Sequence, residues 1–450
     1  MDSRYELIVI GTGVAASTVA SRVRNAGRSV AIVDFRPFGG TCVLRGCDPK
    51  RVLMSGAETV SAVERMYGRG VSGEVAIRWP ELMAFKRTFT DPIPSQRESQ
   101  YAAEGINAFH GRARFTGRNS ITVEGTALEA RHIVLATGAE PVKLGIPGEQ
   151  YLTTSEQFLS LERLPPRVVF VGGGYIAAEL SHLSARSGAR VTVLQRGERM
   201  LPLFEPKLVD WLMDSFRAAG IDVHTRTSAE AIERVAGSTF RVHASSGGKS
   251  QTFEGDLVVH AAGRAPELDI LDLPRAGVVV NNGRIELNEY LQSVSNPAVY
   301  AAGDAARKGP ELTPIAGLDG DVVATNLLEG NRRPATYVAI PSVAFTIPPI
   351  ASVGLSEEQA HQDGRKFRTN CQRASDWYTA RRVCESVYGF KVLIEEGSGH
   401  ILGAHLVGPG VEETINLFAL AIRFGLTADD LKQTIFSYPT CSSDLVHMVQ

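Results

Sequence analysis

Two stretches of the chain share one pattern of apolar and polar positions. Residues 5–34 open with a short apolar run, pass through a glycine turn into a helical pattern, and close with a second apolar run. Residues 167–196 repeat this order. Apolar runs on both sides of a helix are typical of parallel strands that are buried on both faces. The pattern therefore predicts two βαβ units in an α/β fold.

The pattern changes near residue 334, where strand-like pieces precede one helical stretch. These pieces and the helix lie at residues 342–346, 386–396, 401–408 and 412–425. The apolar face of the helix consists of Ile415, Phe418, Ala419 and Ile422. We expect a third, α+β domain, in which the apolar face of this helix must be buried against another surface. Residues 300–304, a strand ending in Gly-Asp, are expected to return the chain to the first domain.

The first glycine turn carries a dinucleotide-binding fingerprint. Gly11 permits the tight turn, Gly13 lets a pyrophosphate approach the backbone, and Ala16 lets helix and strand pack closely. The helix N-terminus would then face the phosphates. Asp34 ends the next strand, where a carboxylate accepts the ribose hydroxyls. The alternative is a glycine-rich turn in an ordinary βαβ unit.

The second turn repeats the fingerprint with Gly172 and Gly174, but its second strand ends in a basic residue. An acid at that strand end favours a free 2′-hydroxyl, whereas a basic residue pairs with a 2′-phosphate. Arg196, with Arg199 nearby, therefore predicts NADPH as the nucleotide rather than NADH. The alternative is that both arginines are solvated surface residues.

Two of the five cysteines, Cys42 and Cys47, stand five positions apart just before a helix that is expected to start near Pro49. Thiols at this spacing can form a disulfide with a small loop, and the helix dipole would stabilise a thiolate on Cys47. A zinc site needs a second pair of ligands at zinc spacing, which the sequence lacks. A redox disulfide is the preferred interpretation, and a metal site or two buried free cysteines are the alternatives.

Composition narrows the possible functions. Lys and Arg together number 47 and Asp and Glu 49, a net charge of −2. This balance argues against broad electrostatic binding of nucleic acid and against a polybasic membrane anchor. No apolar run approaches the roughly 18 residues that span a bilayer, and the charged start leads into a strand rather than a signal peptide. We therefore expect a cytoplasmic enzyme without nucleic-acid or membrane partners.

Several motifs together resemble a known family. Residues 39–50 read GGTCVLRGCDPK after the first fold, and residues 172–179 read GGGYIAAE at the start of the second. This combination resembles the class I flavoprotein disulfide reductases, which include glutathione reductase, lipoamide dehydrogenase and mercuric reductase. Further matches, which extend the resemblance over essentially the whole chain, lie at residues 136–138, 263–266, 303–304 and 341–360.

The resemblance implies two Rossmann-like dinucleotide-binding domains plus a C-terminal α+β dimerisation domain. An FAD-binding domain would comprise residues 1–148 and a return segment, 264–333. Residues 149–263 would bind NAD(P)H, and residues 334–450 would form the interface of a homodimer.

The resemblance also implies roles for single residues. Cys42 would be the interchange thiol that attacks the acceptor, and Cys47 the charge-transfer thiolate against the flavin. Lys50 and Glu179 would pair beside the flavin, where a cation stabilises developing negative charge. Tyr175 would cover the nicotinamide pocket. The implied cofactor-binding residues are Gly11, Gly13, Ala16, Asp34, Gly40, Thr41, Lys50, Thr137, Gly138, Gly172, Gly174, Tyr175, Ile176, Glu179, Arg196, Gly263, Arg264, Gly303 and Asp304.

The C-terminal segment departs from the family. Disulfide-reducing members carry His-Pro-Thr there, with a glutamate five residues after the histidine. Here Tyr438 stands at the histidine position, Ser443 at the glutamate position and Asp444 one residue later. A phenol with a pKa near 10 is a poor base at neutral pH compared with an imidazole near 6.5. Tyr438 remains a candidate catalytic residue, but glutathione and lipoamide rank lower as substrates.

Two further residues have open roles. Cys441 could approach the partner's active site, although a small buried interface residue is the simpler interpretation. Asp48 stands where the family usually has an apolar residue. Its carboxylate could cap the following helix or oppose the Cys47 thiolate.

These observations predict a homodimeric FAD enzyme that passes electrons from NADPH, through FAD and the Cys42–Cys47 disulfide, to an unidentified small acceptor. The dimer contact is expected from about residue 335 onward. The alternatives are a reductase of mercury or another soft metal ion, a glutathione-reductase-like disulfide reductase, and a redox sensor with little turnover. No resident metal is expected.

Overall fold

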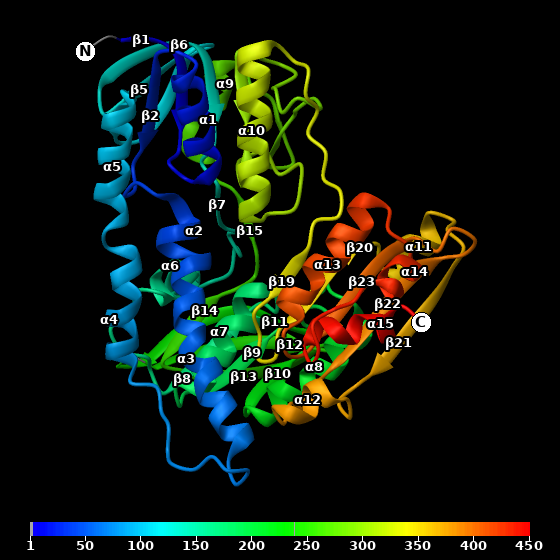
Figure 1. Ribbon diagram of the computed structural model, residues 1–450. Coiled ribbons are helices and arrows are strands. Elements are labelled where there is room, and N and C mark those ends of the chain that lie inside the picture. Colours follow the sequence, from blue (N-terminus) through cyan, green and yellow to red (C-terminus); the bar gives the residue numbers. More distant parts are fainter. Residues whose placement is uncertain (1–2, 238) are drawn as a thin grey trace. The chain divides into compact units, whose positions relative to one another are not determined.

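The computed structural model describes residues 3–237 and 239–450 of the chain (Figure 1). These residues form two compact units, each assembled from segments that are distant in sequence. The first unit comprises Met1–Lys50, Ala84–Val142 and Arg264–Tyr337, and the second comprises Arg51–Met83, Lys143–Gly263 and Val338–Gln450. Two helices, α3 (Cys47–Met66) and α4 (Trp79–Thr90), contain two of the five points where the chain passes from one unit to the other.

The core of the first unit is a sheet with the strand order β3-β2-β1-β6-β5-β4, and β18 pairs with β6. Strands β1, β2, β3, β6 and β18 are parallel, whereas β4 and β5 form an antiparallel extension. The bounds are β1 (Arg4–Ile10), β2 (Val30–Asp34), β3 (Asn107–His110), β4 (Ala113–Gly117), β5 (Ser120–Val123), β6 (Thr126–Leu135) and β18 (Val299–Ala301). The return segment therefore adds a strand to the first sheet.

Two helices of the first unit, α1 (Val14–Asn25) and α10 (Thr313–Glu329), lie side by side (Figure 1). Their contact is close because Gly320 has no side chain: a Cβ there would lie 2.8 Å from the carbonyl oxygen of Ala15. The smaller elements are α2 (Gly40–Arg45), α5 (Ile93–Glu104), β7 (Ala139–Pro141), β15 (Arg264–Pro266), η2 (Asp269–Leu271), α9 (Leu273–Ala276), β16 (Val280–Asn281), β17 (Arg284–Ile285) and η3 (Gly303–Ala305).

The second unit contains a parallel sheet with the order β10-β9-β8-β14, and beside it the antiparallel sheet β11-β12-β13. The strands are β8 (Arg167–Val171), β9 (Arg190–Leu194), β10 (Ile221–His224), β11 (Thr227–Ala236), β12 (Thr239–Ser246), β13 (Lys249–Gly255) and β14 (Leu257–His260). The helices are η1 (Glu149–Tyr151), α6 (Ser155–Phe158), α7 (Tyr175–Arg186) and α8 (Pro206–Ala218). Both predicted βαβ units are thus present, and the α/β prediction is confirmed.

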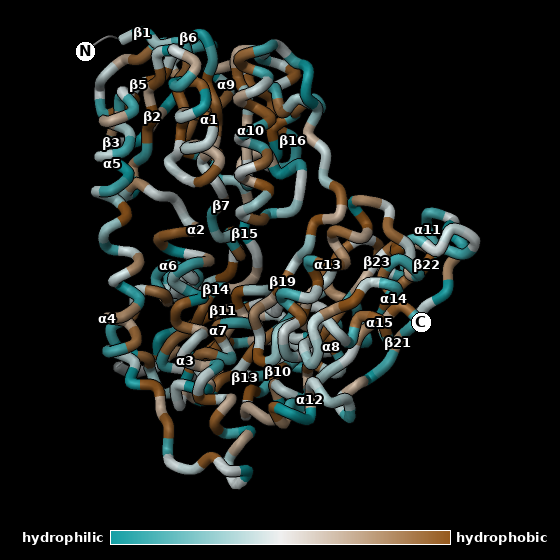
Figure 2. The backbone as a smooth tube through the Cα atoms, in the orientation of Figure 1, coloured by the Kyte–Doolittle hydropathy of each residue, from teal (hydrophilic) through white to brown (hydrophobic). Residues whose placement is uncertain are grey.

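The C-terminal part of the second unit is the predicted α+β domain. Its antiparallel sheet has the order β19-β20-β23-β22-β21. The elements are β19 (Ser342–Ala344), β20 (Ile350–Gly354), α11 (Glu357–Gln362), β21 (Phe367–Arg373), α12 (Tyr378–Arg382), β22 (Gly389–Glu395), β23 (Ile401–Val407), α13 (Val411–Phe424), α14 (Ala428–Gln433), η4 (Cys441–Asp444) and α15 (Leu445–Met448). Figure 2 shows apolar residues along β23 and α13, which pack against each other.

One expectation about helix α13 was wrong. Ile415 and Phe418, which were expected to need cover from another copy, are fully buried against the chain's own sheet. The helix period placed them correctly on one face, but that face packs inward. The exposed apolar side chains of this region instead include Leu420 (50%), Phe424 (69%), Leu426 (38%) and Ile435 (97%). Within the described part of the chain, no helix is both long and apolar enough to cross a membrane.

Candidate redox site

The two cysteines of the close pair lie at a junction of helices in the first unit. Helix α2 ends at Arg45, and α3 begins at Cys47. Cys42 is partly buried and Cys47 is exposed. Thr313, the first residue of α10, donates its hydroxyl to Cys42 Sγ at 3.0 Å and lies 3.6 Å from Cys47 Sγ. One hydroxyl therefore contacts both sulfur atoms.

No motif in the sequence marks Thr313 as a site residue. Thr313 is 266 residues from Cys47, and only the packing of α10 brings it to the thiols. The available signal was Thr313-Pro314, because proline in the first turn marks a helix start. That signal predicts the helix but not the sulfur contact.

Asp48 makes a contact that neither sequence interpretation anticipated. The Cys42 thiol donates to Asp48 Oδ1 at a sulfur–oxygen distance of 3.8 Å. Hydrogen bonding to Cys47 raises the pKa of the Cys42 thiol far above its usual value, and burial and the charges of Cys47 and Asp48 raise it further. The Thr313 hydroxyl acts in the opposite direction and lowers this pKa. On balance, these groups disfavour the thiolate form of Cys42.

A concavity of the first unit joins the cysteine pair to the first glycine turn. Nine predicted cofactor-binding residues line it together with Cys42 and Cys47: Gly11, Gly13, Asp34, Gly40, Thr41, Thr137, Gly138, Gly303 and Asp304. Ala16 is fully buried beneath the turn, as close packing of helix and strand requires. Neither Lys50 nor Arg264 lines the concavity; Arg264 donates to the carbonyl of Ala139.

This concavity suits a pyrophosphate cofactor. Gly11 has a φ of +113°, and a Cβ there would lie 2.2 Å from the carbonyl oxygen of Ala136. At Gly40 a Cβ would lie 2.4 Å from the Cα of Gly13. Side chains at these positions would collide with the chain's own backbone, so only glycine allows the tight turn and the close approach of the loops beside the concavity. The hydroxyl of Thr137 is buried without a hydrogen-bond partner in the described residues, so it is available to a bound group.

Carboxylates surround the concavity. Asp34 accepts hydrogen bonds from the Thr12 hydroxyl at 2.7 Å and from the Arg36 backbone N–H at 3.0 Å. The Arg36 guanidinium forms a two-pronged contact with Glu267, at 2.5 and 2.9 Å. Burial raises the pKa of Asp304, against the opposing effect of nearby arginines. Asp34 therefore stands at the predicted strand end, but Arg36 and Glu267 form a paired contact beside it that the sequence did not predict.

A buried carboxyl supports the Gly303–Asp304 turn. Asp319, on α10, accepts from the Gly303 backbone N–H at 3.0 Å and from the Tyr337 hydroxyl at 2.7 Å. Burial raises the pKa of Asp319 to about 6. The helix thus fixes both the turn, through Asp319, and the cysteine pair, through Thr313.

The second glycine turn has the same geometry as the first. Gly172 has a φ of +115°, and a Cβ there would lie 2.1 Å from the carbonyl oxygen of Ala261. Gly174 faces open space. At the end of β9, Arg196 is exposed, and the Nε of Arg199 is buried without a partner in the part of the chain that is described. Two guanidinium groups at this strand end suit a nucleotide that carries an extra phosphate.

Helix α7 presents two of the remaining predicted residues. Tyr175 begins the helix, and its ring centroid lies 5.4 Å from that of Phe204. Burial raises the pKa of Tyr175 to about 12. Glu179 is 1% exposed and accepts from the Phe345 backbone N–H at 2.9 Å. Lys50 belongs to the first unit and Glu179 to the second, so their pairing stays a prediction.

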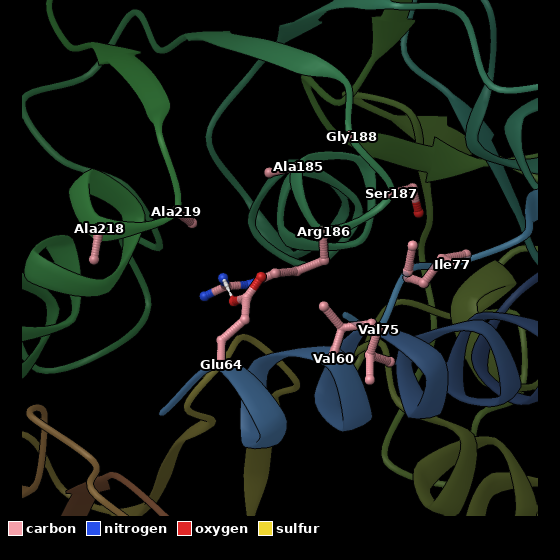
Figure 3. Close-up of a pocket in the computed structure, with 11 residues that line it drawn as sticks. Val60, Glu64, Val75, Ile77, Ala185, Arg186, Ser187, Gly188, Ala218 and Ala219 are labelled. Atoms are coloured by element: carbon pink, nitrogen blue, oxygen red, sulfur yellow. Dashed lines mark hydrogen bonds and ion pairs between the residues drawn. The ribbon is translucent and has the colours of Figure 1, made fainter. Parts of the chain in front are cut away.

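The second unit has a further hollow of about 530 Å³, shown in Figure 3. It lies among the end of α3, the segment that carries Val75, and the C-terminal ends of α7 and α8. Arg186 reaches from α7 to an ion pair with Glu64 on α3 (Figure 3). None of the sequence-predicted site residues lines this hollow.

The residues of the C-terminal segment with predicted or open roles differ in exposure and in contacts. Tyr438 is 81% exposed. Cys441 packs against the backbone at Gly410, where a Cβ would lie 2.5 Å from its sulfur. Ser443 closes a capping box with Thr440, and Asp444 accepts from the Tyr388 hydroxyl at 2.8 Å. Ser443 and Asp444 thus stabilise the terminal turn.

Comparison with known proteins gives consistent matches. The model of the pyridine nucleotide-disulphide oxidoreductase family matches residues 5–320, and that of its dimerisation domain matches residues 340–449. The mercuric reductase of Streptomyces lividans is 34% identical, over 98% of this chain and 94% of its own. The glutathione reductase of Burkholderia cepacia is 33% identical, over 98% of each chain.

Solved structures agree with these matches. The HOCl-induced flavoprotein disulfide reductase RclA from Escherichia coli superposes with a TM-score of 0.88 at 25% identity, over 99% of both chains. Its Cu(II) complex gives a TM-score of 0.89 at 25% identity, over 100% of this chain and 99% of that one. The chain belongs to the pyridine nucleotide-disulphide oxidoreductase family and is an NAD(P)H-dependent flavoprotein oxidoreductase that uses FAD.

Proposed function

We propose that the chain uses NADPH and FAD to reduce the Cys42–Cys47 disulfide, and that the reduced pair then reduces a small acceptor. The observation that carries this proposal is the concavity that places both thiols and the first glycine turn together in one unit. Bound FAD would supply the two-electron exchange between the nicotinamide and the cysteine pair. A cytoplasmic location stays a prediction.

The two glycine fingerprints indicate which segments of the chain bind FAD and which bind NADPH. We assign FAD binding to residues 1–148 and 264–333, with Gly11, Gly40 and Thr137 beside the phosphates or ribose. Residues 149–263 would bind NADPH, with Arg196 and Arg199 toward its 2′-phosphate. Residues 334–450 would form the contact between two copies.

The protein's own groups control the protons of the pair. Cys47 begins α3, a helix of 20 residues, so the helix N-terminus favours a thiolate there. Cys42 holds its proton, because Cys47 and Asp48 lie against it. Thr313 donates to Cys42 and so favours the thiolate that must form before this sulfur can attack. Reaction at Cys42 therefore requires that its proton leave.

The acceptor is proposed to be one that needs no histidine. Tyr438 occupies the histidine position, and its phenol is exposed. General acid–base help is typically worth about 10²–10⁴-fold, so a disulfide acceptor would react slowly without it. A thiophilic metal ion is the second candidate, because such an ion displaces thiol protons directly. The named mercuric reductases among the relatives and the Cu(II) complex of RclA support this candidate.

An acceptor screen tests the proposal. Purified FAD-loaded protein would be mixed with NADPH and with disulfides, quinones or Cu²⁺, and NADPH consumption would be followed. We expect at least one acceptor to turn over, and expect Cys42→Ser to abolish that turnover. Cys384→Ser, which alters a thiol outside the pair, is the matched control and should keep it. Turnover that survives Cys42→Ser would contradict the proposal, and no turnover with any acceptor would favour a redox sensor.

A further inference from the structure

A carboxylate stands beside the sulfur that is proposed to meet the acceptor. Asp48 is exposed in the first turn of α3, and its Oδ1 lies 3.8 Å from Cys42 Sγ. The groups that act on the Cys42 thiol are Cys47, Thr313 and Asp48. Thr313 is neutral, and a Cys47 thiolate disappears when the disulfide closes. Asp48 therefore supplies the negative charge of this set that does not depend on the redox state of the pair. An acceptor that reaches Cys42 therefore comes close to that charge.

We propose that Asp48 is a specificity-determining residue, whose carboxylate favours cationic acceptors at Cys42 and disfavours anionic ones. The proposal rests on the proposed function of the cysteine pair and names the acceptor class that this function left open. It also accounts for a residue that departs from the apolar one usual at this position.

The size of the effect follows from Coulomb's law. A reagent charge about 7 Å from the carboxylate, at an effective dielectric constant of about 40–80, changes a rate about 3- to 7-fold. The effect has opposite signs for a cation and an anion. Their rate ratio should therefore change by about tenfold or more when the charge is removed. Salt should reduce this ratio, because the Debye length falls from about 30 Å at 0.01 M to about 3 Å at 1 M.

The first test measures thiol reactivity without turnover. FAD-loaded protein is reduced and treated with methanethiosulfonates that carry a trimethylammonium or a sulfonate group, and labelling of Cys42 is timed by mass spectrometry. We expect Asp48→Asn to lower the cation-to-anion rate ratio about tenfold, and Asp48→Glu to retain most of it. An equal ratio in wild type and Asp48→Asn, at low salt, would overturn the proposal.

A matched control removes a charge far from the thiols. Glu329 is exposed at the last position of α10, the helix that begins at Thr313. At 1.5 Å per residue it lies about 24 Å from that helix start, beyond the Debye length of about 10 Å at 0.1 M salt. Glu329→Gln should therefore leave the reagent ratio unchanged. A shift equal to that of Asp48→Asn would mean that net charge, not Asp48, sets the ratio.

The second test compares turnover with two small disulfides of opposite charge. Cystamine is cationic and dithiodipropionate is anionic. In each case the reduced pair gives two electrons and the Cys42 proton, and solvent supplies the second proton. The acceptor S–S bond breaks, the Cys42–Cys47 bond forms, and two thiols leave. We expect wild type to favour cystamine in kcat/KM, and Asp48→Asn to reduce this preference about tenfold. A preference for the anion in wild type would overturn the proposal.

Turnover with Cu²⁺ as the acceptor shows whether Asp48 acts on metal cations as it does on organic ones. Each reduced pair gives one electron to each of two Cu²⁺ ions, releases its protons and closes its disulfide. We expect Asp48→Asn to lower turnover with Cu²⁺ as well as with cystamine. A loss confined to Cu²⁺ would contradict the charge effect and would mean that the carboxylate binds the metal ion directly. Loss of cystamine turnover with little change for Cu²⁺ assigns an organic cation. If Cys42→Ser retained turnover, the cysteine-pair function itself would fail, whatever the reagent ratios showed.

Discussion

Replacing Thr313 with valine removes a hydroxyl that contacts both thiols, while the side chain keeps nearly the same shape. The hydroxyl donates to Cys42 Sγ at 3.0 Å and lowers the pKa of that thiol. A hydrogen bond to a charged group is worth about 1.5–3 kcal/mol. Because Thr313 is partly exposed, the lower end applies. At about 1.4 kcal/mol per pKa unit, the Cys42 pKa should rise by about one unit.

The assay follows iodoacetamide alkylation of the reduced, FAD-loaded protein as pH is varied, with each cysteine quantified by mass spectrometry. Below its pKa, Cys42 should alkylate about tenfold more slowly in Thr313→Val, because about tenfold less thiolate is present. Thr18→Val removes a hydroxyl of the same unit that bonds only to the Val14 carbonyl, and should change nothing at Cys42. An unchanged Cys42 profile in Thr313→Val would refute the assigned hydrogen bond.

Three further predictions follow from other parts of the structure. Arg196→Glu should repel a 2′-phosphate and shift the preference in kcat/KM from NADPH toward NADH. A wild type that already prefers NADH would refute the assignment of Arg196 to the 2′-phosphate. Tyr438→Phe should lower turnover with the native acceptor by less than about tenfold. The reason is that the exposed phenol offers at most one hydrogen bond, worth about 0.5–1.5 kcal/mol. A much larger loss, with flavin reduction by NADPH unchanged, would mean that the phenol donates a proton. Burial raises the pKa of Asp319 from 3.8 to about 6, so the folded state favours the neutral carboxyl. The free energy of unfolding should therefore rise by about 3 kcal/mol as pH falls from about 6 to about 4. Asp319→Asn should remove this dependence in urea unfolding, and an equally steep pH profile in the variant would contradict the assignment.

The fold was predictable because its signals are local. Gly11 and Gly172 each adopt a positive φ and approach a neighbouring strand where a side chain would collide. A short glycine motif between two apolar runs encodes that geometry within about thirty residues. The two sheets, the α+β domain and the family could therefore be read from the sequence.

The contacts around the thiols were not predictable in the same way. Thr313 reaches them only because α10 packs beside α1, and no local pattern encodes that packing. The sequence placed Asp48 next to Cys47 but left the direction of its side chain open, and the structure turns it to Cys42. Helix periodicity grouped Ile415 with Phe418 but did not say whether the chain's own sheet or a second copy would cover them.

The redox state of each cysteine before and after NADPH shows directly whether Cys42 and Cys47 carry the electrons. Oxidised, FAD-loaded protein is treated anaerobically with one equivalent of NADPH, and free thiols are alkylated and located by mass spectrometry. We predict that Cys42 and Cys47 are protected before NADPH and alkylated after it, while Cys371, Cys384 and Cys441 do not change. If NADPH reduces the flavin and leaves the labelling of Cys42 and Cys47 unaltered, the cysteine pair is not the electron relay.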